Sequence, residues 1–290
     1  MYLHVNVTIT GATGFIGRYM VESFSRDGHS VRALSRGAWD VLAGEPPAQS
    51  LTSADAVVHL AGTPVAQRWT REARRTIRDS RVLGTRHLVS ALSKMPQRPE
   101  VLVCASAIGI YGDRGDEMLT EDSPVSTGFL ADVCREWEAE ADGAESLGVR
   151  VVKLRTGIAL GRNGGALEKM LPPFRAFAGG RLGSGHQWMS WIHIADIVGL
   201  IRYAIDHSLS GVVNATAPNP VRNLDFTHEL GAAIHRPALF PMPAAALRML
   251  LGEMATVLLA SQCVVPKAAL SAGYRFAFPE LGPALRDLSR

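Results

Sequence analysis

Apolar runs rich in β-branched residues alternate with longer stretches of helical periodicity through the first half of the chain. Most of these runs are continuously apolar at their centres, as expected for strands that are buried on both faces. This alternation predicts a parallel sheet with helices on both faces. The predicted strands are 4–9, 30–35, 56–61, 100–106 and 149–155, and the predicted helices are 15–27, 70–94 and 128–147.

After about residue 156 the pattern loosens into shorter elements. Glycine- and proline-rich loops are predicted at 161–165, 171–173 and 179–185, and an amphipathic helix near 279–289. The fold class is therefore predicted to be α/β, a Rossmann-type doubly wound parallel sheet with a small, mostly helical C-terminal lobe over the strand ends. The predicted domains are an NADP-binding Rossmann domain, 1–160 plus parts of 190–217, and a substrate-side C-terminal lobe, 161–189 and 218–290.

The first predicted strand ends in the glycine-rich segment ITGATGFIG, which leads directly into the first predicted helix. The order strand, Gly-x-x-Gly-x-x-Gly, helix is typical of a dinucleotide-binding βα unit. Gly11 allows the tight turn, Gly14 lets the backbone approach a pyrophosphate, and Gly17 lets the helix pack close to the strand. With the helix N-terminus facing the phosphates, the predicted cofactor-binding residues are Gly11, Thr13, Gly14, Phe15 and Ile16.

The residue that closes the second predicted strand distinguishes NAD from NADP. An acidic side chain there binds the ribose 2′-hydroxyl, whereas a nearby arginine accommodates a 2′-phosphate. The strand ends on Ser35 and Arg36, and no acidic residue follows until Asp40. The sequence therefore predicts NADP(H), with Ser35 and Arg36 at the 2′-phosphate. The alternative is that Arg36 is a solvated loop residue.

Composition narrows the classes of protein to which the chain can belong. Of its 290 residues, 47% are hydrophobic and 20% are charged, which is the balance of a soluble globular protein. The net charge of +3 is too small to argue for a nucleic-acid or membrane partner. Three cysteines without CxxC spacing indicate a reducing compartment. Because we find neither a signal peptide nor a bilayer-spanning run, we expect a cytoplasmic protein with a small-molecule substrate.

Four segments together resemble the extended short-chain dehydrogenase/reductase superfamily: ITGATGFIG, VVHLAG at 57–62, CASAIGIYG at 104–112 and WIHIADI at 191–197. Longer segments, among them RWTREARRTIRDSRVLGTRHL and LRTGIALGRNGGALEKMLPPF, are similar to its atypical subgroup of NAD(P)-dependent epimerase-family proteins. The tail from LRMLLGEMATVLLAS onwards resembles the C-terminal domain of unknown function attached to that subgroup. The predicted cofactor site then also includes Leu60, Ala61, Gly62, Ala105 and Arg155.

The catalytic pair of that superfamily is absent from this chain. Short-chain dehydrogenases use a tyrosine and a lysine four residues apart on one helix face, where the lysine holds the nicotinamide ribose and lowers the pKa of the tyrosine. No tyrosine of this sequence has a lysine four residues later. When Glu138 is aligned with the family's downstream glutamate, Leu130 and Cys134 fall at the tyrosine and lysine positions.

Ser106 and Tyr111 are the candidate catalytic residues. Ser106 follows the strand VLVCA, where the superfamily keeps a hydroxyl beside the substrate carbonyl; its alternative role is to cap the strand end. Tyr111 lies in the next turn and is either an acid that reaches the same site or a packing residue with a satisfied hydroxyl. Cys134 is better explained as a buried small hydrophobe than as a nucleophile, because no lysine or histidine lies within four residues of it.

Seven arginines between residues 68 and 86 make the region after VVHLAG strongly basic. The favoured interpretation is a solvated helix face that Glu72 and Asp79 partly balance. The alternative is that Arg68 or Arg81, at the ends of the stretch, binds an anionic substrate.

His193 and Asp196 lie three residues apart at a predicted strand-to-helix junction. This spacing suits a structural role better than a catalytic dyad, with Asp196 capping the helix that follows. We find no group of His, Cys, Asp and Glu at metal-ligand spacing, so no metal is expected.

Together these patterns predict an NADP(H)-dependent oxidoreductase or epimerase-like enzyme that acts on a small carbonyl or alcohol without the usual Tyr-xxx-Lys pair. Ser190 stands where sugar-nucleotide epimerases usually carry an arginine, which argues against a sugar nucleotide. The alternative is a non-catalytic NADP(H)-binding redox sensor or regulatory protein, which the missing pair favours. The resemblance also implies a possible homodimer through the helices near 70–94 and 128–147.

Overall fold

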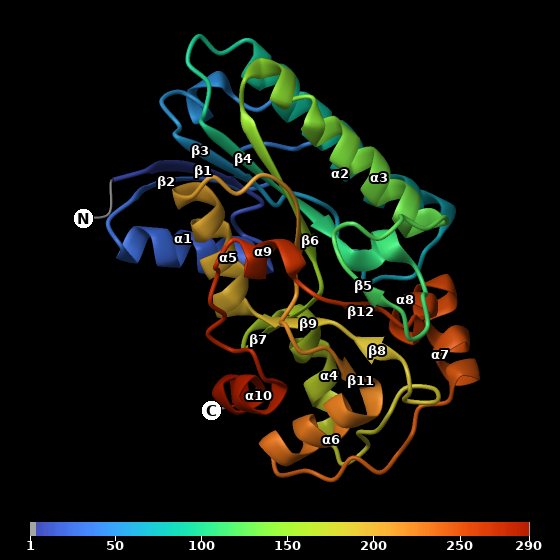
Figure 1. Ribbon diagram of the computed structural model, residues 1–290. Coiled ribbons are helices and arrows are strands. Elements are labelled where there is room, and N and C mark those ends of the chain that lie inside the picture. Colours follow the sequence, from blue (N-terminus) through green and yellow to red (C-terminus); the bar gives the residue numbers. More distant parts are fainter. Residues whose placement is uncertain (1–3, 290) are drawn as a thin grey trace.

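A six-stranded parallel sheet forms the centre of the protein, whose computed structural model describes residues 4–289 (Figure 1). The strand order is β2-β1-β3-β4-β6-β10, with every neighbouring pair parallel. The predicted Rossmann-type sheet is thereby confirmed. Because the chain passes from β2 across β1 to β3, the order reverses between β1 and β3, which is where ligands bind in such sheets. The strands are β1 (Asn6–Thr10), β2 (Ser30–Leu34), β3 (Ala56–His59), β4 (Val101–Ala107), β6 (Arg150–Thr156) and β10 (Gly211–Ala215).

Helices cover both faces of this sheet (Figure 1). Alternate strand residues enter two separate cores: Val58 and Val103 pack with one pair of helices, whereas Val57 and Leu102 pack with the other. All four side chains are buried, which explains why the strands are apolar without interruption. The first pair is α1 (Phe15–Arg26) and α5 (Ile194–Asp206), and the second is α2 (Arg71–Ser93) and α3 (Phe129–Asp142).

A third core belongs to the C-terminal lobe, which lies at the carboxyl edge of the sheet (Figure 1). β6 leads through Gly157 directly into this lobe, and Trp191 and Phe226 are fully buried in its core. The lobe carries most of the remaining helices: α4 (Gly165–Arg175), α6 (Asn223–Ala233), α7 (Ala244–Leu251), α8 (Ala255–Leu259) and α10 (Leu281–Ser289), while α9 (Lys267–Ser271) packs beside the sheet. The division into the two predicted domains stays a prediction.

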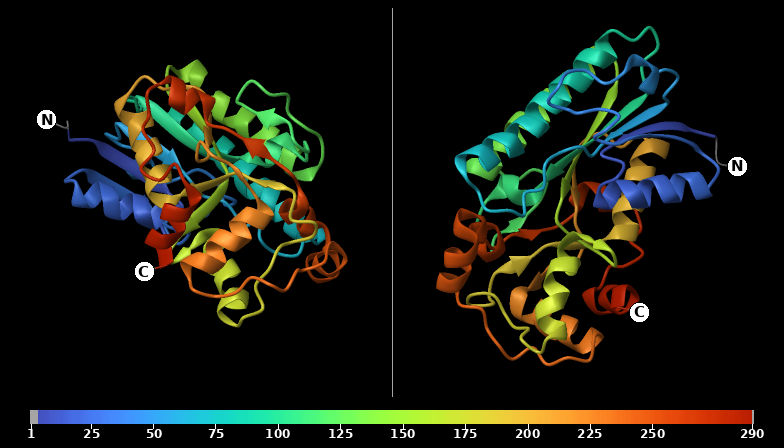
Figure 2. Two further views of the ribbon diagram at one scale, coloured as in Figure 1. Left: turned by 60° about the horizontal axis from the view of Figure 1, so that its bottom comes forward. Right: turned by 180° about the vertical axis from the view of Figure 1, so that it is seen from behind.

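The strand pair β5 (Met118–Leu119) with β12 (Cys263–Val264) joins the lobe to the sheet domain. Glu253, between α7 and α8, pairs with Arg74 near the start of α2, so the lobe reaches that helix as well (Figure 2). The other short strands pair as β7 (Ile158–Gly161) with β9 (Trp191–His193), and β8 (Trp188–Met189) with β11 (Val221–Arg222).

The loop predicted at 171–173 is wrong, because those residues lie inside α4. Pro172 and Pro173 each remove a backbone donor and normally break a helix. Here Leu167, Leu171 and Phe174 are buried on one face of α4, and this packing outweighs the local cost. The helix predicted at 128–147 also ends early, at Asp142, and a short 3-10 turn, Glu145–Leu147, follows it.

Within residues 4–289, no helix combines the length and the apolar character that crossing a membrane requires.

Candidate functional site

The glycine turn between β1 and α1 is built by close backbone contacts. Gly11 has a φ of +67°, and a Cβ atom there would stand 2.8 Å from the backbone nitrogen of Ala61. A Cβ atom on Gly17 would stand 2.3 Å from the carbonyl oxygen of Gly11. These two glycines therefore let α1, the turn and the end of β3 pack against one another.

The outer side of this turn is open. Thr13 and Gly14 are exposed, and a Cβ atom on Gly14 would meet only the carbonyl oxygen of Gly11, at 3.1 Å. Gly14 is the N-cap residue of α1, and the first turn of the helix holds no acidic side chain. Its first N–H groups, from Phe15 onwards, are thus free for an anion. The turn fits the pyrophosphate of a dinucleotide.

The end of β2 lies beside this turn, since the backbone nitrogen of Ala12 donates to the carbonyl oxygen of Leu34 at 3.3 Å. Ser35 is half-buried and Arg36 is exposed. The nearest acid in sequence, Asp40, accepts a hydrogen bond from the backbone of Leu42. Arg36 is therefore placed where a 2′-phosphate would lie, without a carboxylate to repel it.

The ends of β3 and β4 continue the same edge. The backbone nitrogen of Leu60 donates to the carbonyl oxygen of Thr10, and that of Ala61 to the Thr10 hydroxyl. Gly62 is exposed, and Ala105 on β4 is half-buried. The structure thus gathers the predicted cofactor residues from the four strands β2, β1, β3 and β4 along one edge, with Arg155 as the exception.

A second group of glycines at this edge was missed by the sequence analysis. Cβ atoms on Gly161, Gly164 and Gly165 would stand 2.5, 2.3 and 2.7 Å from ring atoms of Phe15. Arg18 of α1 also donates to the carbonyl oxygen of Asn163 at 3.0 Å. The loop at 161–165 therefore packs against the ring of Phe15, the first residue of α1. Only glycines at these three positions leave room for that ring.

Ser106 is joined to a buried ion pair. Its Oγ donates to Oε1 of Glu138 at 2.6 Å, and Arg155 donates to both carboxylate oxygens of Glu138, at 2.8 and 2.7 Å. Burial opposes the charge of Arg155, but the hydrogen bonds and charge of Glu138 outweigh it and raise the pKa of Arg155. All three guanidinium nitrogens of Arg155 bind protein groups: Nε and Nη2 bind Glu138, and Nη1 binds Tyr111. Arg155 is therefore engaged within the protein, behind the edge of the sheet.

Tyr111 lies in the same network and is fully buried. Its hydroxyl accepts from Nη1 of Arg155 at 2.9 Å and donates to Oδ1 of Asn214 at 2.8 Å. Burial raises the pKa of Tyr111, against the charge of Arg155. These surroundings match the alternative that Tyr111 is a packing residue with a satisfied hydroxyl.

The positions of the missing catalytic pair carry no proton-transfer group. The side chain of Leu130 packs over Gly109. Cys134 is buried, and burial raises the pKa of its thiol to about 11, so the thiol stays protonated at neutral pH. Neither side chain can replace the Tyr-Lys pair chemically.

Two of the arginines of α2 pair with acids on α3. Arg78 pairs with Glu136, and Arg86 pairs with Glu140. The expectation that Glu72 and Asp79 balance this basic face is therefore incomplete: of these two, only Asp79 takes part, with Arg75 and Arg78. The acids on α3 could not be assigned from sequence because they lie more than 50 residues away.

His193 and Asp196 both have structural roles, but the cap of α5 is His193 rather than Asp196. His193 caps α5, since its Nδ1 accepts from the backbone nitrogen of Ala195 at 3.1 Å. The buried carboxylate of Asp196 instead accepts from the backbone nitrogens of Ala277 and Phe278, at 2.7 and 2.9 Å. The prediction that Asp196 caps the helix is wrong, whereas its structural role holds: it fastens the C-terminal segment to α5.

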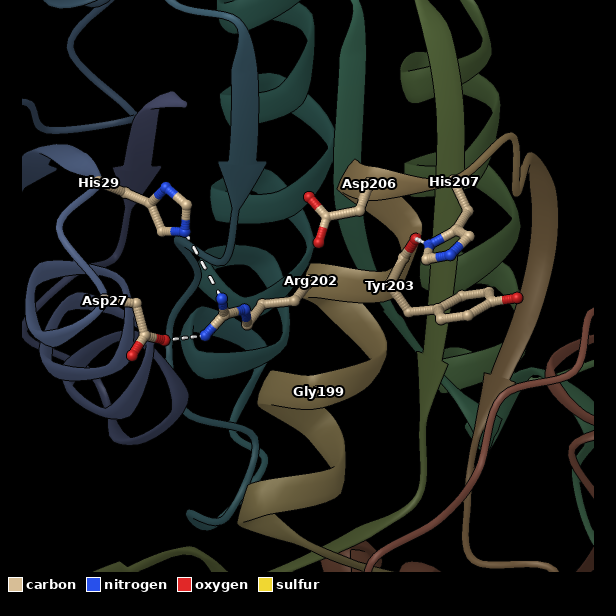
Figure 3. Close-up of a pocket in the computed structure, with 7 residues that line it drawn as sticks. All are labelled: Asp27, His29, Gly199, Arg202, Tyr203, Asp206 and His207. Atoms are coloured by element: carbon tan, nitrogen blue, oxygen red, sulfur yellow. Dashed lines mark hydrogen bonds and ion pairs between the residues drawn. The ribbon is translucent and has the colours of Figure 1, made fainter. Parts of the chain in front are cut away.

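A hollow of about 590 Å³ opens at the other edge of the sheet, between the end of α1 and α5 (Figure 3). Arg202 crosses it and pairs with Asp27, and the rings of Tyr203 and His207 stack at 3.9 Å. Because Asp27 precedes β2, this hollow lies at the amino end of the strands, away from the glycine turn. Across the described part of the chain, no group of acidic, histidine and cysteine side chains could hold a metal ion.

The fold and the glycine turn define a dinucleotide-binding Rossmann protein of the short-chain dehydrogenase/reductase type. The chain belongs to the NAD dependent epimerase/dehydratase family, which it matches over residues 7–216. Residues 242–288 match a domain of unknown function, DUF1731. The family and the C-terminal domain expected from the sequence are thereby confirmed.

Relatives of similar length are found in a plant, a bacterium and humans. The chain is 43% identical to the epimerase family protein SDR39U1 homolog, chloroplastic, of Arabidopsis thaliana, over 98% of this chain and 86% of that protein. It is 37% identical to the epimerase family protein YfhF of Bacillus subtilis, over 98% of each. The crystal structure of human epimerase family protein SDR39U1 (isoform 2) with NADPH superposes with a TM-score of 0.89 at 34% identity, covering 98% of this chain and 99% of that one.

Proposed function

We propose that this protein is an NADP(H)-dependent oxidoreductase or epimerase-like enzyme that acts on a small carbonyl or alcohol held at Ser106. The observation that carries the proposal is the single edge that joins Arg36, the open glycine turn and Ser106. Support also comes from the human relative, whose structure was solved with NADPH.

The residues along this edge fit NADP(H) in sequence from β2 to β4. Arg36 and Ser35 suit the 2′-phosphate, and Thr13 and Gly14 at the helix N-terminus suit the pyrophosphate. Leu60 to Gly62 and Ala105 would line the rest of the molecule. Bound there, the cofactor supplies or accepts a hydride at C4 of the nicotinamide.

Ser106 would orient the substrate oxygen. Because its proton is donated to Glu138, the free lone pairs of Oγ can accept a hydrogen bond from a substrate hydroxyl. For a carbonyl substrate, the hydroxyl of Ser106 would have to rotate away from Glu138 to donate. In this proposal Arg155 holds Glu138 in place and Tyr111 holds Arg155, so neither contacts the substrate or the cofactor.

A screen of small alcohols with NADP⁺ and small carbonyls with NADPH tests the proposal through the near-ultraviolet absorbance of the reduced nicotinamide. For any substrate found, Ser106→Ala is expected to lower turnover about 100-fold, in the range for loss of one polar contact to the reacting oxygen. The Kd of NADPH should stay within about twofold of that of the unaltered protein, a change much smaller than the tenfold that corresponds to about 1.4 kcal/mol. Unchanged turnover would remove Ser106 from the mechanism, and the exposed-face variant Ser25→Ala serves as the control.

One observation favours a second function, an NADP(H)-binding regulator without catalysis. Leu130 and the protonated Cys134 leave the usual proton-transfer positions inert. A regulator would bind a partner protein differently with NADPH and with NADP⁺. The same set of bound proteins with both forms, recovered by affinity capture on the tagged protein, would contradict regulation.

A cytoplasmic location and a homodimer stay predictions. The facing arginines and acids of α2 and α3 pair within one chain, so these pairs supply no evidence for a partner subunit. Sedimentation of the purified protein measures the oligomeric state directly.

A further inference from the structure

The connection from α6 into α7 carries large apolar side chains into solvent. Leu239 and Phe240, in the connection, are 74% and 61% exposed. Met249 and Leu250, on α7, are 80% and 63% exposed. Of the six most exposed large apolar side chains within residues 4–289, these are four, and Phe177 is a fifth. Apolar surface that is concentrated in this way marks an interaction site, whereas single exposed residues do not.

Backbone hydrogen bonds fix this connection against the loop that follows α4. The backbone nitrogen of Phe240 donates to the carbonyl oxygen of Gly179 at 3.0 Å, and that of Met242 to the carbonyl oxygen of Arg181 at 2.8 Å. Phe177 lies two residues before Gly179, so the loop, the connection and α7 form a continuous stretch of surface. The connection runs along the side of the lobe that faces away from the central sheet (Figure 1). We call this stretch the apolar face, and its large exposed side chains are Phe177, Leu239, Phe240, Met242, Met249 and Leu250.

Arginines without acidic partners accompany the apolar face. The sequence holds no aspartate or glutamate in residues 169–195 or 230–252, which include the loop after α4, the connection and α7. Arg175, Arg236 and Arg248 are exposed, and none of them forms an ion pair among residues 4–289. The guanidinium of Arg236 lies 4.7 Å from the centre of the Phe177 ring, so charge and apolar surface are in contact. The net charge of +3 for the whole chain conceals this local positive charge.

The shape and the charge of this face indicate its partner. Side chains that are 61% to 80% exposed project from the surface instead of lining a groove, so they suit a partner that deforms around them. A second copy of the chain would bring like arginines together across a two-fold interface, which is unfavourable. We propose that the apolar face binds the surface of a membrane rich in anionic lipids, with its apolar side chains among the acyl chains and its arginines at the lipid phosphates.

The dimensions of α7 limit the contact to the membrane surface. The helix has eight residues and is therefore about 12 Å long, too short to cross a bilayer. Its buried side chain, Leu247, holds it on the protein, whereas Met249 and Leu250 are free to insert. The protein would thus lie on the membrane at the level of the headgroups.

The backbone of the connection also suits an apolar environment. Pro237, Pro241 and Pro243 have no backbone N–H, so fewer donors lose water when the segment enters the interface. The N–H groups of Phe240 and Met242 already donate to the loop after α4. Insertion therefore leaves these donors paired, as an environment without water requires.

Co-sedimentation of the full chain with lipid vesicles tests the inference. Vesicles of phosphatidylcholine and phosphatidylserine in equal parts should bind the protein at least about tenfold more tightly than vesicles of phosphatidylcholine alone, and added salt should weaken this binding. Leu239→Ser/Phe240→Ser should lower the partition coefficient at least about tenfold, and Arg236→Gln should lower it about fivefold. The matched controls are Leu270→Ser on α9, where the side chain is 48% exposed, and Arg26→Gln on α1, and both should bind as the unaltered protein does.

Other outcomes overturn the inference. If neither kind of vesicle binds the protein, or both bind it equally, the face is not a site for anionic lipid. If Leu239→Ser/Phe240→Ser binds as the unaltered protein does, another part of the chain contacts the lipid. Self-association in sedimentation velocity that this variant abolishes, without vesicle binding, would make the face an interface between copies of the chain.

Should Leu239→Ser/Phe240→Ser fail to fold by circular dichroism, Met249→Ser/Leu250→Ser on α7 decides between the same results. No residue of the apolar face belongs to the candidate cofactor site. Failure of this inference therefore leaves the proposed function unchanged, and failure of the proposed function leaves this inference unchanged.

Discussion

Arg155 holds both carboxylate oxygens of Glu138, at 2.8 Å through Nε and 2.7 Å through Nη2, and the pair is almost wholly buried directly behind Ser106. The pair does more than neutralise two charges. Because Glu138 also accepts the proton of Ser106, it fixes the direction in which that hydroxyl presents its lone pairs. The ion pair thus connects the stability of the fold to the chemistry of the candidate site.

Removing one partner of this pair should be strongly destabilising, because the other charge is then buried alone. Glu138→Gln and Arg155→Met are each expected to lower the free energy of unfolding by about 3 kcal/mol. The double variant Glu138→Gln/Arg155→Met should lose much less than the sum of the two effects. Urea unfolding measures all three values, and additive losses would contradict the coupling.

Gly14→Ala separates cofactor binding from folding. A Cβ atom at this position meets only the carbonyl oxygen of Gly11, at 3.1 Å, so we expect a loss of stability of about 1 kcal/mol, as for a changed N-cap. The added methyl group would occupy the open side of the turn, and the Kd of NADPH should rise at least about tenfold. Thermal unfolding and fluorescence titration measure the two effects, with Ser25→Ala on the same helix as the control. Undiminished affinity would place the pyrophosphate elsewhere.

The glycine turn is also where sequence reasoning succeeds best. The roles of Gly11 and Gly17 follow from local sterics, and the structure shows both contacts. The position of Arg36 just after the end of β2 was also predicted from local sequence, and its role at a 2′-phosphate stays a prediction. Such features are encoded within about 30 consecutive residues, so the sequence can be interpreted without the rest of the fold.

Features that depend on distant residues were missed or misassigned. The hydroxyl of Tyr111 donates to Asn214, which follows 103 residues later, and no local sequence pattern predicts that contact. The loop that packs against the ring of Phe15 lies some 150 residues further along the chain. A glycine cluster such as 161–165 predicts only a turn until the ring that fills it is known.

His59 should make stability depend on pH. Burial lowers the pKa of His59 to about 4; its Nδ1 lies 2.7 Å from Oγ1 of Thr10, and its buried Nε2 has no partner among the described residues. The unfolded chain binds the proton more tightly, with a pKa near 6.5, so protonation favours unfolding. The stability that neutral His59 contributes is fully present above about pH 6.5 and is lost as the pH falls towards 4. The free energy of unfolding then decreases by about 3 kcal/mol.

His59→Asn removes this titration. The variant should show a shallower fall in the free energy of unfolding between pH 6.5 and 4 than the unaltered protein, whatever its absolute stability. His228→Asn, at an exposed position, is the control and should keep the original slope. Equal slopes for all three proteins in urea unfolding would show that His59 binds its proton as readily in the folded protein as in the unfolded chain.

The three cysteines should be inert in the folded protein. Cys104, Cys134 and Cys263 are all buried, and burial raises the pKa of each thiol. Because the thiolate is the reactive form, an aromatic disulfide reagent should label them only after denaturation, when three equivalents react. Rapid labelling of Cys134 in the native state would reopen a nucleophilic or redox role for it.

Binding of NADP(H) along this edge of the sheet can be measured by fluorescence titration with NADPH and with NADH. NADPH should bind at least about tenfold more tightly than NADH. Arg36→Ala should abolish that preference by weakening the binding of NADPH while leaving the Kd of NADH unchanged. Arg26→Ala, at the far exposed end of α1, is the control and should keep the preference. Saturable binding with a preference that depends on Arg36 is the predicted result, whereas no saturable binding of either nucleotide would contradict both the cofactor site and the enzyme built on it.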